Sequence, residues 1–304
     1  MILSKQIRSL KFFLFPAGSD LSLGYFRIFF FLTFYLVFAD TDYFLAWQNV
    51  PREMWYGQGL TEWLKPILIS APIEPLFWIW RIALIFACLG FFTRASSFTV
   101  FVASFVLIAH AQSFGYFTRL FMPVLWALFF LMWAPMGHRM SLDSLIRNRL
   151  SIKKSSSISS QEYGWPFVFL RVLFCIVFFQ AGLSKLINSG WDWFSGESLQ
   201  NRMIHAFVWP FNPYDRILMD WNQELFSSRA FCSLAAIGSI ALELLCPLAL
   251  WSRRLRGSII LPLAFFQIVV RFTIFVNFSG YVPLYLAWVP WERLCSHHKA
   301  GNAK

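Results

Sequence analysis

Residues 165–186 read WPFVFLRVLFCIVFFQAGLSKL, an almost unbroken apolar run in which Arg171 and Lys185 are the only charged side chains. A helix needs about 20 mostly apolar residues to cross the hydrocarbon core of a bilayer, and this run is long enough. It is too long and too evenly apolar for a buried β-strand. The stretch therefore predicts a membrane-spanning helix.

Seven further apolar runs lie on either side of it. They cover residues 21–42, 75–93, 96–115, 119–137, 230–251, 257–275 and, shorter and interrupted by Pro283 and Pro290, 279–294. The residues between the runs include Pro, Gly, Ser and charged side chains. The sequence thus predicts an all-α polytopic membrane protein with about eight transmembrane helices.

The composition agrees with a bilayer environment. Of the 304 residues, 58% are hydrophobic and only 13% are charged, whereas soluble domains have about 45–50% apolar and about 25% charged residues. This excludes a cytosolic enzyme, a disordered chain and a nucleic-acid-binding domain, so no nucleic-acid partner is expected despite the formal net charge of +11. In a membrane protein, surplus Lys and Arg usually fix the orientation.

Basic residues are distributed unevenly between the segments that join the runs. If the N-terminus lies inside and every run crosses the membrane, most of the 26 Lys and Arg residues fall in inner or spanning segments, and six fall in outer ones. Such an asymmetry follows the positive-inside rule and predicts that both termini are inside. We expect the chain to lie in a bacterial inner (plasma) membrane.

The ends and the longest inner segment are predicted from their composition. Residues 1–20 carry basic side chains before the first apolar run and are predicted to form a basic amphipathic interfacial helix. The bundle itself is expected over 21–294, followed by a cytoplasmic tail over 295–304. An inner linker is expected over 138–164, and its Ser-rich part, 151–160, is expected to divide the bundle into two packed halves.

Two long outer segments, 43–74 and 187–229, are rich in Trp and Tyr. These side chains favour the membrane–water interface. We therefore expect both segments to form short helices that cap the outer face.

Motifs of soluble enzymes and metal sites are missing from the sequence. It contains no P-loop, GxGxxG or HExxH pattern, and no Cys or His spacing that suits zinc. The five cysteines are scattered, and they are interpreted as packing residues rather than a disulfide or metal framework. No metal is predicted.

Ionisable side chains inside the apolar runs mark the candidate functional positions, because each costs at least about 2.5–3.5 kcal/mol at membrane depth. Arg27 and Arg171 lie near the inner ends of their runs and are expected to extend toward the inner surface. Most of the remaining polar groups fall in the outer half of the bundle, with Glu243 near the middle of its run, which predicts an outward-facing polar cavity. They are Arg81, His110, Arg119, Lys185, Glu243, Gln267 and Arg271.

Several of these residues also have a purely structural interpretation. Glu243 could pair with Arg81 or Arg271 inside the bundle, His110 could be a hydrogen-bonded packing residue, and Lys185 could extend to the outer interface. A desolvated lysine is also a way to make a base, because burial lowers its pKa. Around Lys185, the small residues Ala181, Gly182 and Ser184 would let another helix or a flat ligand approach closely.

The stretch FFQAGLSKL at 178–186, followed by Trp191 or Trp193, Gly196 and Ser198, resembles the HTTM (horizontally transferred transmembrane domain) family, which includes the membrane domain of vitamin K-dependent gamma-carboxylase. Further similar stretches extend the resemblance over residues 20–294. They are Gly24–Ile28, Pro135–Asp143, Glu243–Pro247, Phe265–Gln267 and Phe278–Tyr281.

The resemblance implies that Lys185 is the base that deprotonates a reduced quinone such as vitamin K hydroquinone or menaquinol. Two positions depart from the carboxylase: Gln267 stands where its penultimate span has His, and Tyr116, Thr118 or Arg119 stand where it has a second His. The large soluble outer region of the carboxylase has no counterpart in these 304 residues.

Two functions are therefore predicted. In the first, the chain is a quinol-linked carboxylase- or oxygenase-like enzyme. Lys185 is its catalytic base, the other outer-half residues bind and stabilise the quinol, and a secreted peptide or separate partner protein is the acceptor. In the second, it is a non-catalytic accessory protein for maturation or export of a secreted peptide. A transporter is a third alternative, but the sequence shows no inverted repeat with matched broken helices.

Overall fold

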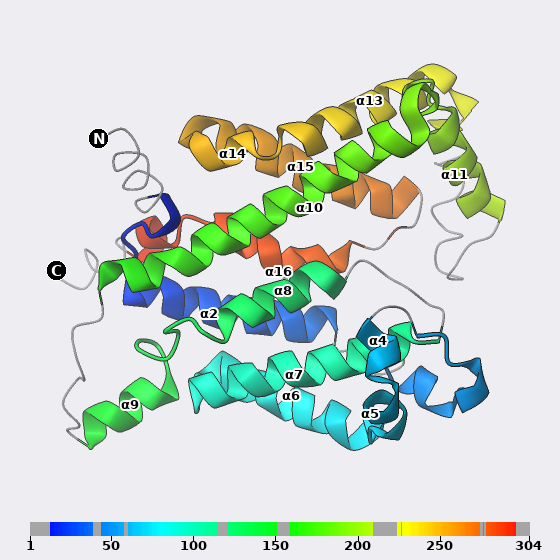
Figure 1. Cartoon of the computed structure of the whole chain (residues 1–304). Helices are drawn as coiled ribbons and strands as arrows, with labels where there is room; N and C mark the ends of the chain where they lie inside the picture. The colour runs from blue at the N-terminus through cyan, green and yellow to red at the C-terminus, as the bar shows by residue number, and fades with distance from the viewer. Residues whose placement is uncertain are drawn as a thin grey trace, which may run out of the picture. The chain divides into compact units, whose positions relative to one another are not determined.

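The computed structural model describes residues 13–38, 44–57, 60–114, 121–150, 159–208, 224–225, 227–273, 276 and 278–295. Helices joined by turns and short loops make up these ranges (Figure 1). No strand occurs in these ranges, and one isolated bridge joins Tyr56 to Phe114. The predicted interfacial helix over 1–20 and the tail over 295–304 lie largely outside them.

The chain divides into two compact units, and unit 1 comprises residues 1–171 and 280–304. Helix α6 packs beside α2 and α7, and the short α16 packs beside α2 and α8. Short helices fill the described part of the predicted cap over 43–74, and α5 among them lies beside α7. The helices of unit 1 are α2 (Asp20–Val37), η1 (Ala46–Asn49), η2 (Arg52–Met54), α4 (Leu60–Trp63), α5 (Lys65–Ser70), α6 (Ile73–Leu89), α7 (Thr93–Gln112), α8 (Met122–Leu131), α9 (Leu142–Arg149), the start of α10 (Ser160–Phe194), η5 (Ser279–Tyr281, from its second residue), α16 (Val282–Tyr285) and η6 (Leu286–Trp288).

Unit 2 comprises residues 172–279 and therefore begins inside α10. Helix α13 packs against α11 and α15, and α14 packs against α15. The remaining helices of this unit are α11 (Glu197–Val208), α13 (Arg229–Leu245), α14 (Leu248–Trp251) and α15 (Arg253–Thr273).

The prediction that the Ser-rich stretch 151–160 divides the bundle was wrong. The boundary falls between Arg171 and Val172, because the first three turns of α10 pack within unit 1. Phe167 contacts the Phe26 ring of α2 edge-on, with centroids 5.0 Å apart. The Arg171 Nε donates to the Ala287 carbonyl oxygen at 2.8 Å. Arg171 thus holds the C-terminal segment and does not extend toward the inner surface as expected.

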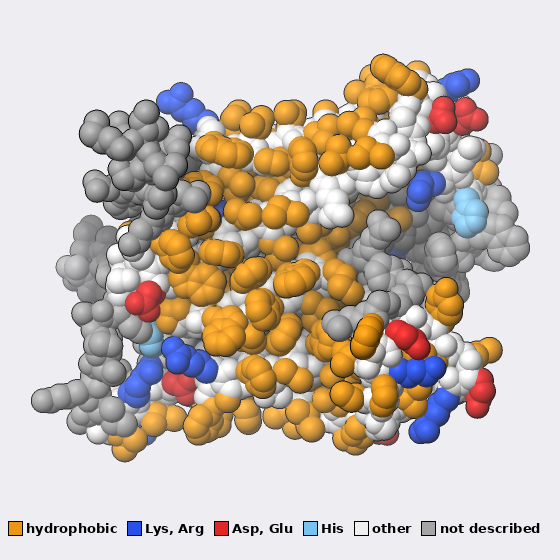
Figure 2. Space-filling model, in the orientation of Figure 1, with side chains coloured by type: hydrophobic (Ala, Val, Ile, Leu, Met, Phe, Trp, Pro, Cys, Tyr) orange, Lys and Arg blue, Asp and Glu red, His pale blue; other side chains and the backbone are white. Residues whose placement is uncertain are grey.

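Four helices in the described part of the chain are long and apolar enough to cross a membrane: α2, α7, α10 and the Arg254–Phe272 stretch of α15. Helices α6 and α13 are slightly shorter, with 17 residues each, and α8 has 10. In unit 1, hydrophobic side chains cover the outward faces of α7 and α8, and charged side chains gather toward the helix ends (Figure 2). The predicted count of eight spans is not established by these helices.

Arg27 differs from its predicted role as a side chain that extends to the inner surface. It is fully buried in α2. Its Nη1 donates to the Met136 carbonyl oxygen at 2.7 Å, and its Nη2 donates to the Met140 carbonyl oxygen. Both carbonyls lie beyond the end of α8, where helix geometry supplies no partner for them. The guanidinium therefore supplies the hydrogen-bond donors for two carbonyl groups of a turn inside the protein.

Asp143 of α9 holds the neighbouring turn between α6 and α7. Its carboxylate accepts from the backbone N–H groups of Phe92 and Thr93, both at 2.8 Å, and from the Thr93 hydroxyl at 2.7 Å. Gly90 ends α6 in the left-handed region at φ 70°. A Cβ there would lie 2.5 Å from the Arg27 Nη1, so glycine is required both for the turn and for the arginine.

We expect Arg27→Leu to lower the free energy of unfolding by about 3 kcal/mol or more, because two carbonyls would lose charge-assisted hydrogen bonds in a buried site. Thermal unfolding of the detergent-solubilised protein, followed by tryptophan fluorescence, measures the change. Arg94→Leu is the matched control, since Arg94 is exposed on α7 and should shift the transition little. Equal shifts for the two variants would contradict the structural role of Arg27.

Candidate functional site

In unit 2, the candidate site lies where α10 and α13 approach each other. Gly182 marks the contact, because a Cβ on it would lie 3.0 Å from the Glu243 Cβ and 3.2 Å from the Leu244 side chain. The absence of a side chain at 182 lets α13 come close to α10. The small residue noted in the sequence therefore admits a second helix, and that helix carries Glu243.

Lys185 and Glu243 form a close ion pair at this contact. The Lys185 Nζ donates to Glu243 Oε1 at 2.6 Å and to Oε2 at 2.7 Å. The carboxylate side chain is 5% exposed and the lysine side chain 22% exposed. Glu243 thus pairs with Lys185, and not with Arg81 or Arg271 as the structural interpretation proposed. Lys185 in turn points into unit 2 toward α13.

Two aromatic rings border the Lys185 ammonium group. Its Nζ lies 5.2 Å from the Trp193 ring centroid and 5.8 Å from that of Phe266. Trp193 reaches this place because the chain bends at Gly190, whose φ of 52° and ψ of −132° are not helical. Such backbone angles are readily available only to glycine. The amine is consequently held between a carboxylate and two apolar ring faces.

The two other predicted site residues of unit 2 lie on α15. Gln267 is buried, and its Nε2 has no hydrogen-bond partner in the described part of the chain. It directly follows Phe266, one of the two rings at Lys185. Arg271 follows one helical turn later and is half-buried. A buried amide donor without an acceptor costs about 1–3 kcal/mol, so Gln267 is a candidate to bind an oxygen atom of a ligand.

The predicted site residues Arg81 and His110 belong to unit 1. The Arg81 guanidinium lies over the rings of Tyr35, Phe77 and Trp78, at 5.4–5.5 Å from their centroids. His110 is buried near the end of α7, and its Nδ1 has no hydrogen-bond partner among the described residues. Whether His110 is a hydrogen-bonded packing residue stays a prediction. Arg119 lies outside the described residues.

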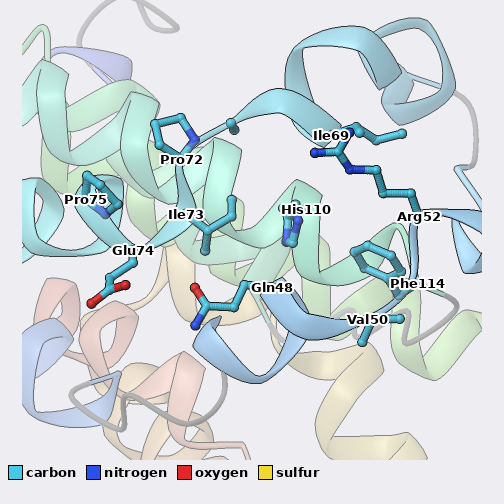
Figure 3. Close-up of a pocket in the computed structure, with 11 residues that line it drawn as sticks. Gln48, Val50, Arg52, Ile69, Pro72, Ile73, Glu74, Pro75, His110 and Phe114 are labelled. Atoms are coloured by element: carbon cyan, nitrogen blue, oxygen red, sulfur yellow. The ribbon is translucent and has the colours of Figure 1, made fainter.

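A pocket of about 310 Å³ opens in unit 1 between the start of α6, the end of α7 and the cap (Figure 3). His110 lines its centre, and Arg52 and Glu74 stand at different sides of it (Figure 3). Its other walls are mainly apolar and include the Phe114 ring. Of the predicted site residues in the described part of unit 1, His110 lines this pocket and Arg81 does not. The prediction of one polar cavity shared by all of them stays a prediction.

The helical fold, with several helices able to cross a membrane, defines a multi-pass membrane protein. The chain belongs to the HTTM family, because the model of that family, described as the HTTM domain, matches residues 18–289. Comparisons with curated proteins and with solved structures find no match. In the part of the chain that the structure describes, no group of three or more His, Cys, Asp and Glu side chains could hold a metal ion.

Sequence reasoning found Lys185 and Glu243 but missed both the pairing and the rings. Trp193 was noted as an interfacial tryptophan and as part of the resemblance, and Phe266 only as part of the resemblance. The signal for Trp193 was Gly190, since a glycine at the end of an apolar run indicates a change of chain direction. For Phe266 there was no local signal, because it lies on a helix distant in sequence.

Replacing only one partner of the ion pair should be more harmful than replacing both. We expect Glu243→Leu to lower the free energy of unfolding by about 3–5 kcal/mol, because the lysine ammonium would stay half-buried without a carboxylate. The double variant Lys185→Met/Glu243→Leu should recover most of this loss. Chemical unfolding of the wild type, both single variants and the double variant measures the coupling. Additive losses would mean that the pair contributes nothing specific to stability.

Proposed function

We propose that this HTTM protein is a quinol-linked carboxylase- or oxygenase-like membrane enzyme in which Lys185 is the base. The observation that carries the proposal is the Lys185–Glu243 pair, held between two apolar helices and beside the Trp193 and Phe266 rings. In a low-dielectric environment, a lysine can give up its charge and act as a base. The resemblance to the membrane domain of gamma-carboxylase assigns that role to the same lysine.

The residues of unit 2 fit a quinol in three respects. The neutral Lys185 amine can take the proton of a quinol hydroxyl, so that an O–H bond breaks and an N–H bond forms. Glu243 stabilises the resulting ammonium, since both of its oxygens lie within 2.7 Å of Nζ. Gln267 offers a buried amide donor that could stabilise the oxyanion, as an oxyanion-hole donor does.

When bound, the quinol would supply an electron-rich oxygen anion that reacts with molecular oxygen, as the resemblance implies. Trp193 and Phe266 would form an apolar wall beside the amine and help to exclude water from the bound quinol. In this proposal, Arg271 completes the binding of the quinol within unit 2, and a secreted peptide or a separate partner protein is the acceptor.

The alternative is a non-catalytic accessory protein for maturation or export of a secreted peptide. The same ion pair supports it, because a lysine bonded to both oxygens of one carboxylate can be purely structural. In that case the aromatic caps would dock the partner, and Lys185 would only join α10 to α13.

Lys185→Arg separates the two functions more sharply than Lys185→Ala. Arginine can keep the pairing with Glu243 but does not give up its proton, so the fold is retained and the base is lost. We expect Lys185→Arg to bind menaquinol and to lose oxygen consumption by about 100-fold or more. Binding by quenching of tryptophan fluorescence and turnover with an oxygen electrode measure the two effects.

The outcomes for the wild type and for Lys185→Ala complete this test. If the wild-type protein neither binds menaquinol nor consumes oxygen, the proposed enzymatic function is wrong. Turnover that survives in both variants would overturn the role of Lys185. If peptide export in cells is also unchanged in Lys185→Arg, the accessory function is favoured.

We also propose that about eight segments cross the plasma membrane, with both termini inside and the caps outside. Exposed tryptophans support this within each unit. In unit 1, Trp63 belongs to a cap helix and Trp133 follows α8; in unit 2, Trp191 lies near the end of α10 and Trp251 ends α14. Tryptophan rings favour the two membrane–water interfaces, so exposed ones near both ends of the spans are expected of such a topology.

Single cysteines in place of these tryptophans test the orientation. Trp63→Cys and Trp191→Cys should react with a membrane-impermeant maleimide in intact cells or spheroplasts. Trp133→Cys and Trp251→Cys should react only after the membrane is permeabilised. Labelling of Trp63→Cys and Trp133→Cys from the same side would contradict the proposed topology.

A further inference from the structure

Helix α9 of unit 1 carries an exposed apolar face for which the described structure offers no cover. None of its residues is buried. Leu142, Leu145, Ile146 and the adjoining Leu150 are between 38% and 64% exposed. The first three recur at the spacing that places side chains on one face of a helix. Four large apolar side chains in nine residues are too many to be left in water without a partner surface.

The opposite face of α9 is fixed to the bundle by polar contacts. Asp143 caps the start of α7, and the Arg147 Nη2 donates to the Gly137 carbonyl oxygen. Ser141 and Ser144 form a capping box at the start of the helix. These contacts fix the orientation of α9 about its own axis. Its apolar face is therefore turned away from the segments that Asp143 and Arg147 contact.

Basic side chains lie on and beside the apolar face of α9. Arg149 lies on the same face, seven residues after Leu142, and is exposed. Arg139 precedes the helix; its side chain is 56% exposed, and its Nη1 lies 4.0 Å from Asp20 Oδ2. Residues 138–154 contain five Lys and Arg and one acid, Asp143, which is bonded within the protein. Figure 2 shows Lys and Arg side chains over the part of unit 1 where Figure 1 places α9. The surface thus combines apolar and cationic groups.

We propose that α9 lies in the headgroup region of the membrane and binds anionic phospholipids. The apolar face would enter the boundary between headgroups and acyl chains, and Arg149 and Arg139 would contact lipid phosphates. A lipid leaflet is the occupant that the structure favours, because α9 lies between α8 and the membrane-spanning α10 in the chain and is fixed to the ends of α6 and α7. This inference does not depend on the chemistry proposed for Lys185.

Spin labels on the two faces of α9 test its position in the bilayer. Ile146→Cys reports on the apolar face, and Asn148→Cys, which is exposed on a different side of the helix, is the control. Both are made in a Cys88→Ala background, since the other four cysteines are buried. The full-length protein is placed in nanodiscs of phosphatidylcholine with and without phosphatidylglycerol.

We expect the label at 146 to be more accessible to oxygen than to a water-soluble nickel complex, and the label at 148 to show the reverse. Phosphatidylglycerol should strengthen the difference. Equal accessibility to the nickel complex at both positions would overturn the proposal, as would a label at 146 that neither reagent reaches, because another part of the protein would then cover the face. Leu145→Cys repeats the measurement should Ile146→Cys fail to fold.

Lipid retention provides a second readout. We expect Arg149→Gln to lower the retention of phosphatidylglycerol, measured by native mass spectrometry, by about fivefold, since one basic residue near an anionic surface contributes about 1 kcal/mol. Arg52→Gln, an equally exposed arginine in the cap, is the control. Equal losses for the two variants would show that the binding is not specific to α9.

Discussion

A charged side chain among apolar helices must find its partner inside the protein, and this constraint organises both units. An unpaired charge among apolar side chains is costly. Unit 1 meets the constraint with backbone carbonyls, since Arg27 binds the turn after α8. Unit 2 meets it with a carboxylate, since Lys185 binds Glu243. In each case the charge determines which segments are joined.

The Arg27 site and the Lys185 site differ in the chemistry that their side chains can perform. A guanidinium stays protonated at any physiological pH, and its carbonyl partners cannot take up a proton, so Arg27 can only hold structure. The Lys185–Glu243 pair also joins two helices, α10 and α13, but it is the pair to which the proposed function assigns a proton transfer. The Arg27 site has no part in that proposal.

The sequence predicted those features that depend on a single stretch of chain. The runs at 21–42, 96–115, 165–186 and 257–275 correspond to the four helices able to cross a membrane, because length and hydropathy are local properties. The close approach at Gly182 also followed from local composition. The unit boundary inside α10 could not be predicted, since the helix is apolar on both sides of Arg171 and nothing in it marks the change.

Partners distant in sequence were beyond the reach of pattern reasoning. Arg27 lies near the end of a span, which made extension to the surface the natural expectation, but its acceptors come from a turn 109 residues away. The sequence left a pairing of Glu243 with Arg81 or Arg271 open, yet its partner is a lysine 58 residues earlier. Local composition cannot distinguish between such partners, because only the packed helices decide which cation reaches the carboxylate.

The bend at Gly190 determines where the Trp193 ring lies relative to the Lys185 amine. Among the described residues, and apart from its chain neighbours and its own helix backbone, no heavy atom lies within 4 Å of where a Cβ at 190 would be, so the glycine is required there by its backbone angles. Trp193 follows this bend, so we expect a straightened backbone at 190 to move its indole away from the amine. The surroundings of Lys185 thus depend on the backbone angles of a residue five positions downstream.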